Sequence, residues 1–519
     1  MKKILTLITV LAISLSAPAA DYTDRLEVTI NGQSSTQQAT ISLTDDGAGN
    51  MKFELPNFVF FLDGQAMPVG NIALTDVKDT VRNGVRTLLC RQDISITAGN
   101  LPDYPMWVGP SLGTVPVDLV AELRGDQLYA VINIDMSATL QQVIQVTFGT
   151  GGYQVGNSGF EQFHTATAGK ATSDEPNRWH SFMSCTGALA GFVSSTPHTF
   201  VSDMVRPGSQ GSKSVLVKSA SVFGIVANGT LTTGRLKAGS IDAASADNCS
   251  FSDPAATDTD ANGDPFYATF NGRPDSLVVW VKFKQQTPVA EFPYATINAV
   301  LTDGSYYQDP EDKTYKNVVA RAACATIESN GNVWQRLAIP FLYETERNDT
   351  AQAPETVGCI HVTISTNAAA GKGTAEDSLL VDDLALVYNS AITDIKVKGV
   401  PATPGNDSYT VSVAGGITAD DIAVSSDGHG ASKQVTLTDT DYGVLATITV
   451  TSADLKHTST ANVRINGATI TGIGNVKQQT GSASSVTARY GIDGRRTGTQ
   501  PTGKLHITRY ANGKTVKSF

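Results

Sequence analysis

Cysteine is scarce and scattered in this chain, with five residues among 519 and no C-x-x-C pair. Cysteine-rich zinc sites and thioredoxin-like redox motifs need closely spaced cysteines, so the sequence argues against both. A compact disulfide framework is not expected at this low density. Buried free thiols are the interpretation we favour, and one disulfide within the middle of the chain stays open as an alternative.

Long hydrophobic runs are also lacking. The longest begins after Met1-Lys2-Lys3, spans Ile4 to Leu15, and leads to Ala17-Pro18-Ala19. It is too short to cross a membrane as a helix, which takes about 20 residues. A basic start, an apolar run and a small-x-small site predict a secretory signal peptide over 1–19. We therefore expect an exported protein, extracellular or on the outer cell surface, with the periplasm as the alternative.

Motifs of common hydrolases are absent, since the chain contains neither H-E-x-x-H nor G-x-S-x-G. A glycoside hydrolase needs only two carboxyl groups about 5–9 Å apart, which sequence alone cannot establish. Glu291, Glu344 and Glu346 are the candidates for such a pair. We predict no catalytic residues, and an unrecognised glycoside hydrolase stays an alternative.

Metal-binding patterns are weak. The seven histidines show no ligand spacing, and we interpret His164 and His180 as structural residues with satisfied hydrogen bonds. The segment Asp258–Asp264 begins like a calcium loop, D-x-D-x-N-G. Thr269 stands at its twelfth position, where a bidentate Glu belongs, and Pro265 interrupts it. An acidic surface turn is therefore the favoured interpretation.

Negative charge predominates, with a formal net charge of -11. Such a chain repels phosphate backbones, so nucleic acid is not an expected partner. The stretch from Lys477 to the end holds eight Lys or Arg and one Asp, which leaves -18 for the rest. The basic C-terminal segment is thus chemically distinct.

Period-two hydrophobic patterns joined by Gly, Asn and Asp turns run through the whole chain and predict an all-β protein. One example places Leu277, Val279, Val281 and Phe283 on the same face of a strand. The patterns divide the mature chain into four units. They are an antiparallel barrel at 21–150, a two-sheet jelly roll at 153–390, a small immunoglobulin-like sandwich at 391–467 and a basic β tail at 473–519, with Gly149–Gly152 as a linker between the first two.

Short motifs along the middle unit resemble a known family. They include Gly159-Phe160-Glu161, Asn177–Phe182, Gly208–Ser214 and Leu380-Val-Asp-Asp-Leu384. Together they resemble the family called the putative carbohydrate metabolism domain, which implies a jelly roll that binds glycans without established catalysis. The first unit, with its order of hairpins and the opening Leu26-Glu-Val-Thr-Ile-Asn-Gly32, resembles the calycin-like domain. The tail, with Tyr490-Gly-Ile-Asp-Gly-Arg-Arg496 and Asn512-Gly-Lys-Thr-Val-Lys517, resembles type IX sorting tails, which implies a surface or secretion machinery as partner. The alternative is one more basic hairpin that packs on an acidic domain.

Glycan binding requires aromatic rings for the apolar faces of sugars and polar side chains for their hydroxyl groups. The candidate binding residues are Trp179, Trp280, Trp334, Tyr306 and Tyr307. Aromatic side chains often belong to the core, and that alternative is favoured for Trp280 and Trp334. For the two tyrosines, which lie in a polar loop, surface and core stay equally open.

Calcium is the one cofactor we predict. Glu161 from the opening segment and Asp382 and Asp383 from the closing segment supply the oxygen ligands that calcium prefers. Such a site joins the first and last strands of the jelly roll. The alternative is that the aspartates accept hydrogen bonds in a turn.

The function we predict is that of a secreted or surface protein that binds glycans through the 153–390 unit without cutting them. A structural adhesin without affinity for sugars is one alternative. A lipocalin-like apolar pocket inside the first unit is another.

Overall fold

The structure is a computed structural model. It describes residues 20–471, together with the backbone of four strands in the tail. The predicted signal peptide at 1–19 and the segment 472–485 lie outside the described residues. Short stretches within the described range are also left out, at residues 32, 47–48, 63–64, 83–84, 125–126, 210, 223 and 348–353.

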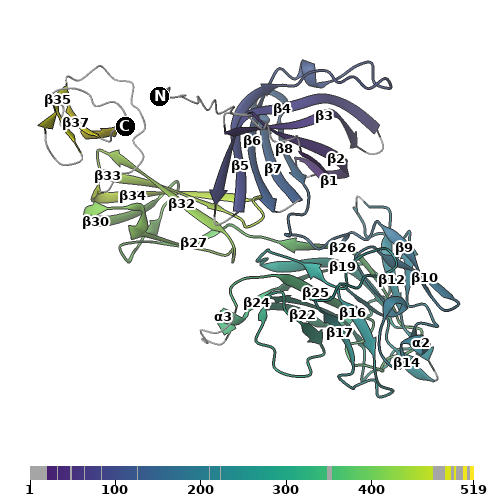
Figure 1. The fold of residues 1–519 in the computed structure, drawn as a ribbon. Helices are drawn as coiled ribbons and strands as arrows, with labels where there is room; N and C mark the ends of the chain where they lie inside the picture. Colours follow the sequence, from purple (N-terminus) through teal and green to yellow (C-terminus); the bar gives the residue numbers. More distant parts are fainter. Residues whose placement is uncertain are drawn as a thin grey trace, which may run out of the picture.

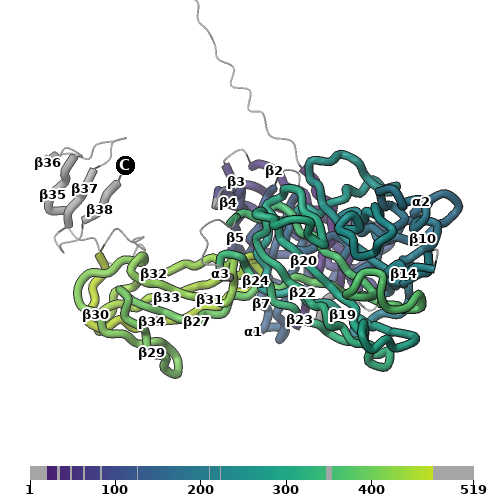
Figure 2. The backbone as a smooth tube through the Cα atoms, turned by 90° about the horizontal axis from the view of Figure 1, so that it is seen from below, coloured from purple at the N-terminus to yellow at the C-terminus, as the bar shows by residue number. Residues whose placement is uncertain are grey.

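Strands make up nearly all of the regular structure, which confirms the predicted all-β fold class. Three β units follow one another from purple to yellow in Figure 1: a barrel, a larger sandwich and a smaller β unit. The tube in Figure 2 shows the smaller unit extending away from the other two. In the part of the chain that the structure describes, no helix is long and apolar enough to cross a membrane.

The first unit is a closed antiparallel barrel in which each strand pairs with the next and β8 pairs back with β1. Alternate residues point inward, as the sequence pattern predicts, and Val117, Leu119 and Ala121 are buried. These inward side chains belong to one cluster of buried apolar residues; the lipocalin-like pocket stays an untested alternative. The strands are β1 (Ala20–Ile30), β2 (Gln33–Asp45), β3 (Asn50–Leu62), β4 (Gln65–Arg82), β5 (Val85–Ser95), β6 (Thr114–Arg124), β7 (Gln127–Met136) and β8 (Gln142–Phe148).

The central unit is a sandwich of two sheets with one continuous apolar core between them. The five-stranded sheet has the order β11 (Thr199–Ser202), β12 (Ser214–Lys218), β26 (Ser378–Val387), β19 (Ser276–Lys284) and β23 (Gln335–Pro340). The facing sheet has the order β15 (Thr230–Thr232), β25 (Cys359–Ser365), β20 (Tyr294–Thr302), β22 (Val318–Glu328) and β24 (Leu342–Tyr343), and β18 (Ala268–Thr269) pairs with β25. The stripe predicted on β19, from Leu277 to Phe283, is fully buried in this core.

Smaller elements cover the sandwich. A three-stranded sheet of β16 (Arg235–Ala238), β17 (Asn248–Ser252) and β21 (Tyr307–Asp309) lies against the outer face of the β25 sheet. Two hairpins are formed by β9 (Phe163–Ala168) with β10 (Ala171–Pro176), and by β13 (Ala220–Val222) with β14 (Ile225–Ala227). The α-helices of the described chain have one turn each: α1 (Ser137–Leu140), α2 (Ala190–Val193) and α3 (Glu344–Arg347).

The third unit has its own small apolar core between two sheets. One sheet has the order β28 (Val400–Pro401), β27 (Ile392–Val397) and β31 (Ile422–Ser426). The other has the order β29 (Thr403–Pro404), β30 (Tyr409–Ile417), β34 (Thr458–Ile470), β33 (Gly443–Thr451) and β32 (Ser432–Thr440). In the tail, the strands β36 (Arg496–Thr497), β35 (Val486–Gly491), β37 (His506–Tyr510) and β38 (Thr515–Ser518) pair in that order.

A cluster of three tyrosines joins the units. Tyr129 of the barrel and Tyr153 of the following segment have ring centroids 5.1 Å apart, and Tyr388 at the end of the sandwich lies 5.7 Å from Tyr153. The third unit reaches the same place, because the Tyr129 hydroxyl donates a 2.5 Å hydrogen bond to the Asp454 carbonyl oxygen. Leu455 packs on the sandwich core beside it. All three units therefore contact one another at this cluster.

The predicted glycine linker is part of this packing rather than a loose spacer. Gly151 has a positive φ of 59°, and a Cβ there would lie 2.5 Å from the ring of Tyr129. Only glycine allows both the left-handed backbone and the close approach of the ring.

Tyr129→Phe keeps the ring and removes the hydrogen bond between the barrel and the third unit. Because the Asp454 carbonyl then loses a buried donor, we expect a loss of about 1 kcal/mol of unfolding free energy in urea. Amide hydrogen exchange across residues 452–457 should become faster at the same time. Tyr104→Phe, in a barrel loop, is the matched control. Unchanged exchange in 452–457 would show that the hydrogen bond does not hold the units together.

Candidate functional site

Three aromatic side chains gather on the small sheet that covers the sandwich. Tyr306, just before β21, is 38% exposed and stacks on Phe251 of β17, with ring centroids 5.9 Å apart and planes at 28°. The ring centroid of Tyr315 lies 6.4 Å from that of Tyr306. Phe251, Tyr306 and Tyr315 are called the aromatic patch below.

Pairing between two distant strands builds this patch. Phe251 is opposite Gln308 in the register of β17 and β21, which brings residue 306 next to residue 251. The hydroxyl of Tyr306 donates to Gln308 Oε1 at 3.0 Å, and that of Tyr315 donates to Asp312 Oδ1 at 2.8 Å. Burial raises the pKa of Tyr306 to about 12, so its hydroxyl stays a neutral donor at physiological pH. Both rings are thus held in place before any ligand arrives.

A charged rim borders the patch. Tyr307 is buried beneath it with its ring 5.2 Å from that of Tyr315, and its hydroxyl accepts a 3.2 Å hydrogen bond from Arg321. Arg321 also pairs with Glu311 at 2.5 Å and with Glu344 at 3.4 Å. All three charged side chains are partly exposed. The arrangement combines an apolar ring face with charged hydrogen-bonding groups, which suits a polar ligand that has flat apolar faces.

His361 of β25 supports the patch from below. Its Nε2 lies 2.9 Å from Ser250 Oγ and its Nδ1 2.7 Å from Ser252 Oγ, so both ring nitrogens have hydroxyl partners on β17. The edge of the imidazole meets Tyr307, with ring centroids 5.6 Å apart. Burial lowers the pKa of His361 to about 3, so it is neutral at pH 7. It therefore holds β17 on the sandwich without adding charge.

The predicted binding residues are dispersed. Trp179 lies in the core with no exposure, where its Nε1 donates to a backbone carbonyl, and Tyr307 is 1% exposed. Trp280 is half-buried on the outer face of the five-stranded sheet, with the Arg206 guanidinium 5.4 Å from its ring. Trp334 is half-buried just before β23. Of the five, Tyr306 alone belongs to the aromatic patch and has an exposed ring.

The predicted calcium ligands are brought to one corner of the sandwich. Glu161 accepts hydrogen bonds from the backbone N–H groups of Ser212 and Lys213, at 3.0 and 3.2 Å. Gly211 makes this possible, since a Cβ there would lie 2.1 Å from Glu161 Oε1. Asp383 Oδ2 accepts from Arg206 Nε at 2.6 Å. Both carboxylates thus hold residues 206 and 212–213 against the first and last segments of the sandwich.

Asp382 differs from these two. Its side chain is fully buried, Oδ2 accepts from the Arg206 backbone N–H at 2.7 Å, and Oδ1 has no hydrogen-bond partner. Burial raises the pKa of its carboxyl to about 6, and the neighbouring Asp383 and Glu161 act in the same direction. The calcium site stays a prediction, because the three carboxylates share the corner but each of them already accepts a hydrogen bond from the protein.

Several residues of the candidate site were not predicted from the sequence. Phe251 lies within β17, and Tyr315 and Arg321 follow the polar loop that carries Tyr306 and Tyr307; no motif in the sequence marks any of the three as a binding residue. Among the candidate catalytic acids, Glu344 pairs with Arg321, Glu291 is exposed, and the side chain of Glu346 lies outside the described residues. The five cysteines are free thiols. Cys249 and Cys359 are buried, as the favoured interpretation predicted, whereas Cys90, Cys185 and Cys324 are partly exposed.

Comparisons with known proteins bear mainly on the barrel. Residues 19–151 match the family model described as a calycin-like beta-barrel domain, which confirms the resemblance noted for the first unit. No curated protein matches the chain.

Two solved structures are weakly similar to this chain. One is described as a putative glycoside hydrolase from Bacteroides thetaiotaomicron; it is 13% identical with a TM-score of 0.29, over 54% of this chain and 87% of that one. The other holds the M60 catalytic domain with the CBM51-1 and CBM51-2 domains of Clostridium perfringens ZmpB; it is 10% identical with a TM-score of 0.14, over 95% of this chain and 45% of that one. Scores this low define neither fold nor function here.

Asp382→Asn tests whether a cation neutralises the corner. The folded-state pKa near 6 lies above the usual value of 3.8, so the stability that this group contributes is fully present below about pH 4 and is lost as pH rises through 6. Without a cation, the substitution should raise stability at pH 7.5 by about 3 kcal/mol and have little effect at pH 4. Thermal unfolding at both values measures this.

If calcium binds at this corner, Asp382→Asn should change the stability at pH 7.5 in the opposite direction. Asp382→Asn would then lower the melting temperature at pH 7.5 in calcium and abolish any stabilisation by the ion. Glu376→Gln, which changes an exposed carboxylate just before the same strand β26, is the control.

Proposed function

We propose that the central sandwich binds a glycan at the aromatic patch and does not cut it. The observation that carries this proposal is the exposed ring of Tyr306, which stacks on Phe251 and is fixed by Gln308. A pyranose ring presents apolar C–H groups that pack against such a face. Because the tyrosine is already ordered, binding requires little loss of side-chain freedom.

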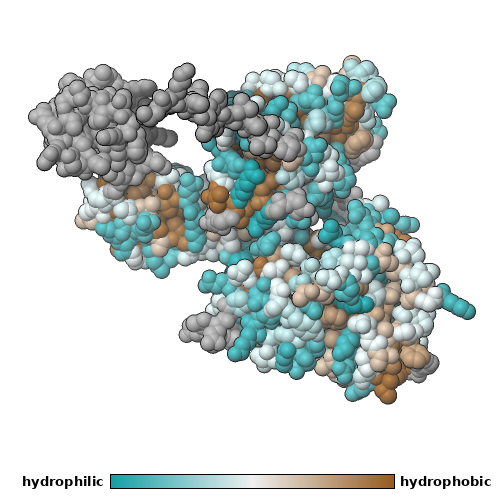
Figure 3. All heavy atoms as spheres, viewed as in Figure 1, coloured by the Kyte–Doolittle hydropathy of each residue, from teal (hydrophilic) through white to brown (hydrophobic). Residues whose placement is uncertain are grey.

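Polar groups around the patch suit the hydroxyl groups of a sugar. Asp312, Lys313 and Asn317 lie in the same loop as the rings, and Arg321 and Glu311 border it. On the face drawn in Figure 3, hydrophilic and weakly hydrophobic residues cover most of the central unit, with apolar residues in small patches. A shallow, hydrated surface of this kind supports a polar ligand with modest affinity per site.

The proposed function also includes export from the cytoplasm. A glycan-binding protein that carries a signal peptide at 1–19 acts outside the cytoplasm, extracellular or on the outer cell surface, with the periplasm as the alternative. The basic tail at 473–519 would then engage a sorting or surface machinery. A cleaved N-terminus in the mature protein, read by mass spectrometry, supports this part of the proposal.

Tyr306→Ala should weaken glycan binding by about tenfold, because stacking on one aromatic ring contributes about 0.5–1.5 kcal/mol beyond its buried area. The measurement is binding of the full mature chain to a panel of soluble polysaccharides by affinity electrophoresis, followed by calorimetry on the best ligand. Tyr104→Ala, which removes an aromatic ring in the barrel, is the matched control and should leave binding unchanged.

Other outcomes assign other functions. Release of reducing sugar from any polysaccharide in the panel would show a glycoside hydrolase. A folded chain that binds none of them would favour a structural adhesin. Binding that Tyr306→Ala leaves intact would place the glycan elsewhere, with the outer face around Trp280 as the next surface to test.

A further inference from the structure

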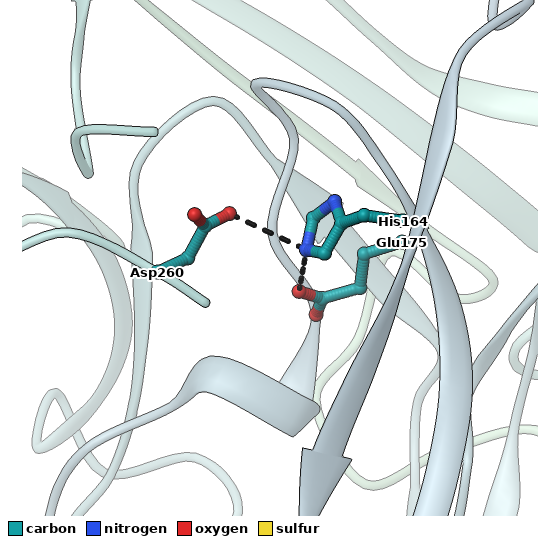
Figure 4. Close-up of side chains that lie close together, drawn as sticks. All are labelled: His164, Glu175 and Asp260. Carbon is teal, nitrogen blue, oxygen red and sulfur yellow. Dashed lines mark ion pairs between the residues drawn. The ribbon is translucent and has the colours of Figure 1, made fainter. Parts of the chain in front are cut away.

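Four side chains from three segments meet in a buried cluster at one end of the sandwich. His164 of β9 and Glu175 of β10 are directly opposite in their hairpin, and Asp260 reaches them from the loop 253–267 between β17 and β18. His164 Nε2 lies 3.8 Å from Glu175 Oε2 and 3.5 Å from Asp260 Oδ2. The close-up in Figure 4 shows these three side chains pointing toward one another. His180 adds a fourth group, with Nδ1 3.4 Å from the same Asp260 oxygen.

The facing atoms are buried and have no hydrogen-bond partners. The side chains of Glu175, His180 and Asp260 are at most 1% exposed, and that of His164 is 10% exposed. His164 Nε2, Glu175 Oε2, His180 Nδ1 and Asp260 Oδ2 all lack a partner. Unpaired polar atoms of this kind are costly in a protein interior, and buried charges occur mainly with a counter-charge or a metal ion.

In each histidine, the ring nitrogen that points away from the cluster makes a hydrogen bond. The nitrogen that faces the cluster therefore has a lone pair. His180 Nε2 lies 3.2 Å from the Pro265 carbonyl oxygen, which can only accept, so Nε2 carries the proton and Nδ1 has the lone pair. His164 Nδ1 lies 3.2 Å from Asn177 Oδ1, and with that oxygen as acceptor Nε2 is the lone-pair atom. Metal-binding histidines are typically oriented by such an outer hydrogen bond.

In each carboxylate, too, one oxygen has hydrogen-bond partners and the other has none. Glu175 Oε1 accepts hydrogen bonds from the backbone N–H and the hydroxyl of Ser181, at 2.7 and 2.5 Å. Asp260 Oδ1 accepts from the backbone N–H groups of Asn262 and Asp264, at 2.9 and 2.8 Å. In each case one oxygen fixes the side chain and the other faces the cluster. Four lone-pair atoms therefore face one another with no donor between them, an arrangement that a cation would stabilise.

We propose that this cluster is a divalent-cation site of the zinc class, held by His164 Nε2, Glu175 Oε2 and Asp260 Oδ2, with His180 Nδ1 as the fourth ligand. The first three atoms all lie within 4.8 Å of one another. Ligands about 2.0–2.2 Å from a tetrahedral zinc ion lie about 3.3–3.6 Å apart, close to the distances found here. Two carboxylates balance the charge of the ion. Two imidazoles favour zinc over calcium, which prefers oxygen ligands alone.

Burial makes this a structural site rather than a catalytic one, because catalytic zinc keeps a position open to water or substrate. The ion joins the β9–β10 hairpin to the loop that follows β17. It also explains why the acidic segment Asp258–Asp264 is not simply a surface turn: Asp258 is exposed and pairs with Arg235, whereas Asp260 points inward.

The test compares two isosteric substitutions in one loop, made in the full chain. Metal content is measured by inductively coupled plasma mass spectrometry after treatment with a chelator and reconstitution with zinc chloride. Calorimetry gives the affinity, and thermal unfolding gives the stabilisation. We expect one zinc per wild-type chain, a melting temperature raised by several degrees, and affinity at least 100-fold weaker in Asp260→Asn. Asp258→Asn, the matched control, should bind as the wild type does.

Further variants separate loss of the site from loss of the fold. Glu175→Gln and His164→Gln should each abolish zinc stabilisation while circular dichroism stays unchanged, and His180→Gln should weaken binding less. Zinc binding that persists in Asp260→Asn and Glu175→Gln would overturn the proposal. A wild-type chain that takes up no zinc, or that is stabilised by calcium but not by zinc, would also overturn it.

Discussion

The contact on which the arrangement of this protein depends is the packing of Tyr129, Tyr153 and Tyr388. Each ring belongs to a different part of the chain, and together they extend the core of the sandwich into the barrel. The buried hydroxyl of Tyr129 adds the third unit through Asp454. Because buried aromatic area and a satisfied hydroxyl act at the same place, the units are fixed relative to one another rather than tethered.

The two proposed sites are joined by one strand of the central unit, β17, and the loop that follows it. β17 carries Phe251 into the aromatic patch, and the loop that follows it carries Asp260 into the buried histidine cluster. His361 holds β17 on the sheet beneath. An ion that fixes the loop 253–267 would thus also stiffen the strand that carries part of the proposed glycan surface.

The predictions that rest on strand periodicity are the ones that the structure confirms most fully. It predicted the all-β class and the buried faces, such as Leu277 to Phe283, since alternation along a strand depends only on which face is buried. Single aromatic residues were harder to place: Trp179 is in the core, while Trp280 is on an outer face. Periodicity cannot tell an outer face covered by a neighbouring loop from one open to solvent.

The sequence by itself determined the class of fold and the net negative charge with its basic C-terminal segment, because these follow from local pattern and composition. Only the tertiary structure decided which distant residues meet. His164 and Asp260 are 96 positions apart, and Phe251 and Tyr306 are 55 apart. Their meeting depends on the pairing of strands across the sandwich, and that pairing is set by burial of the whole core rather than by any short motif.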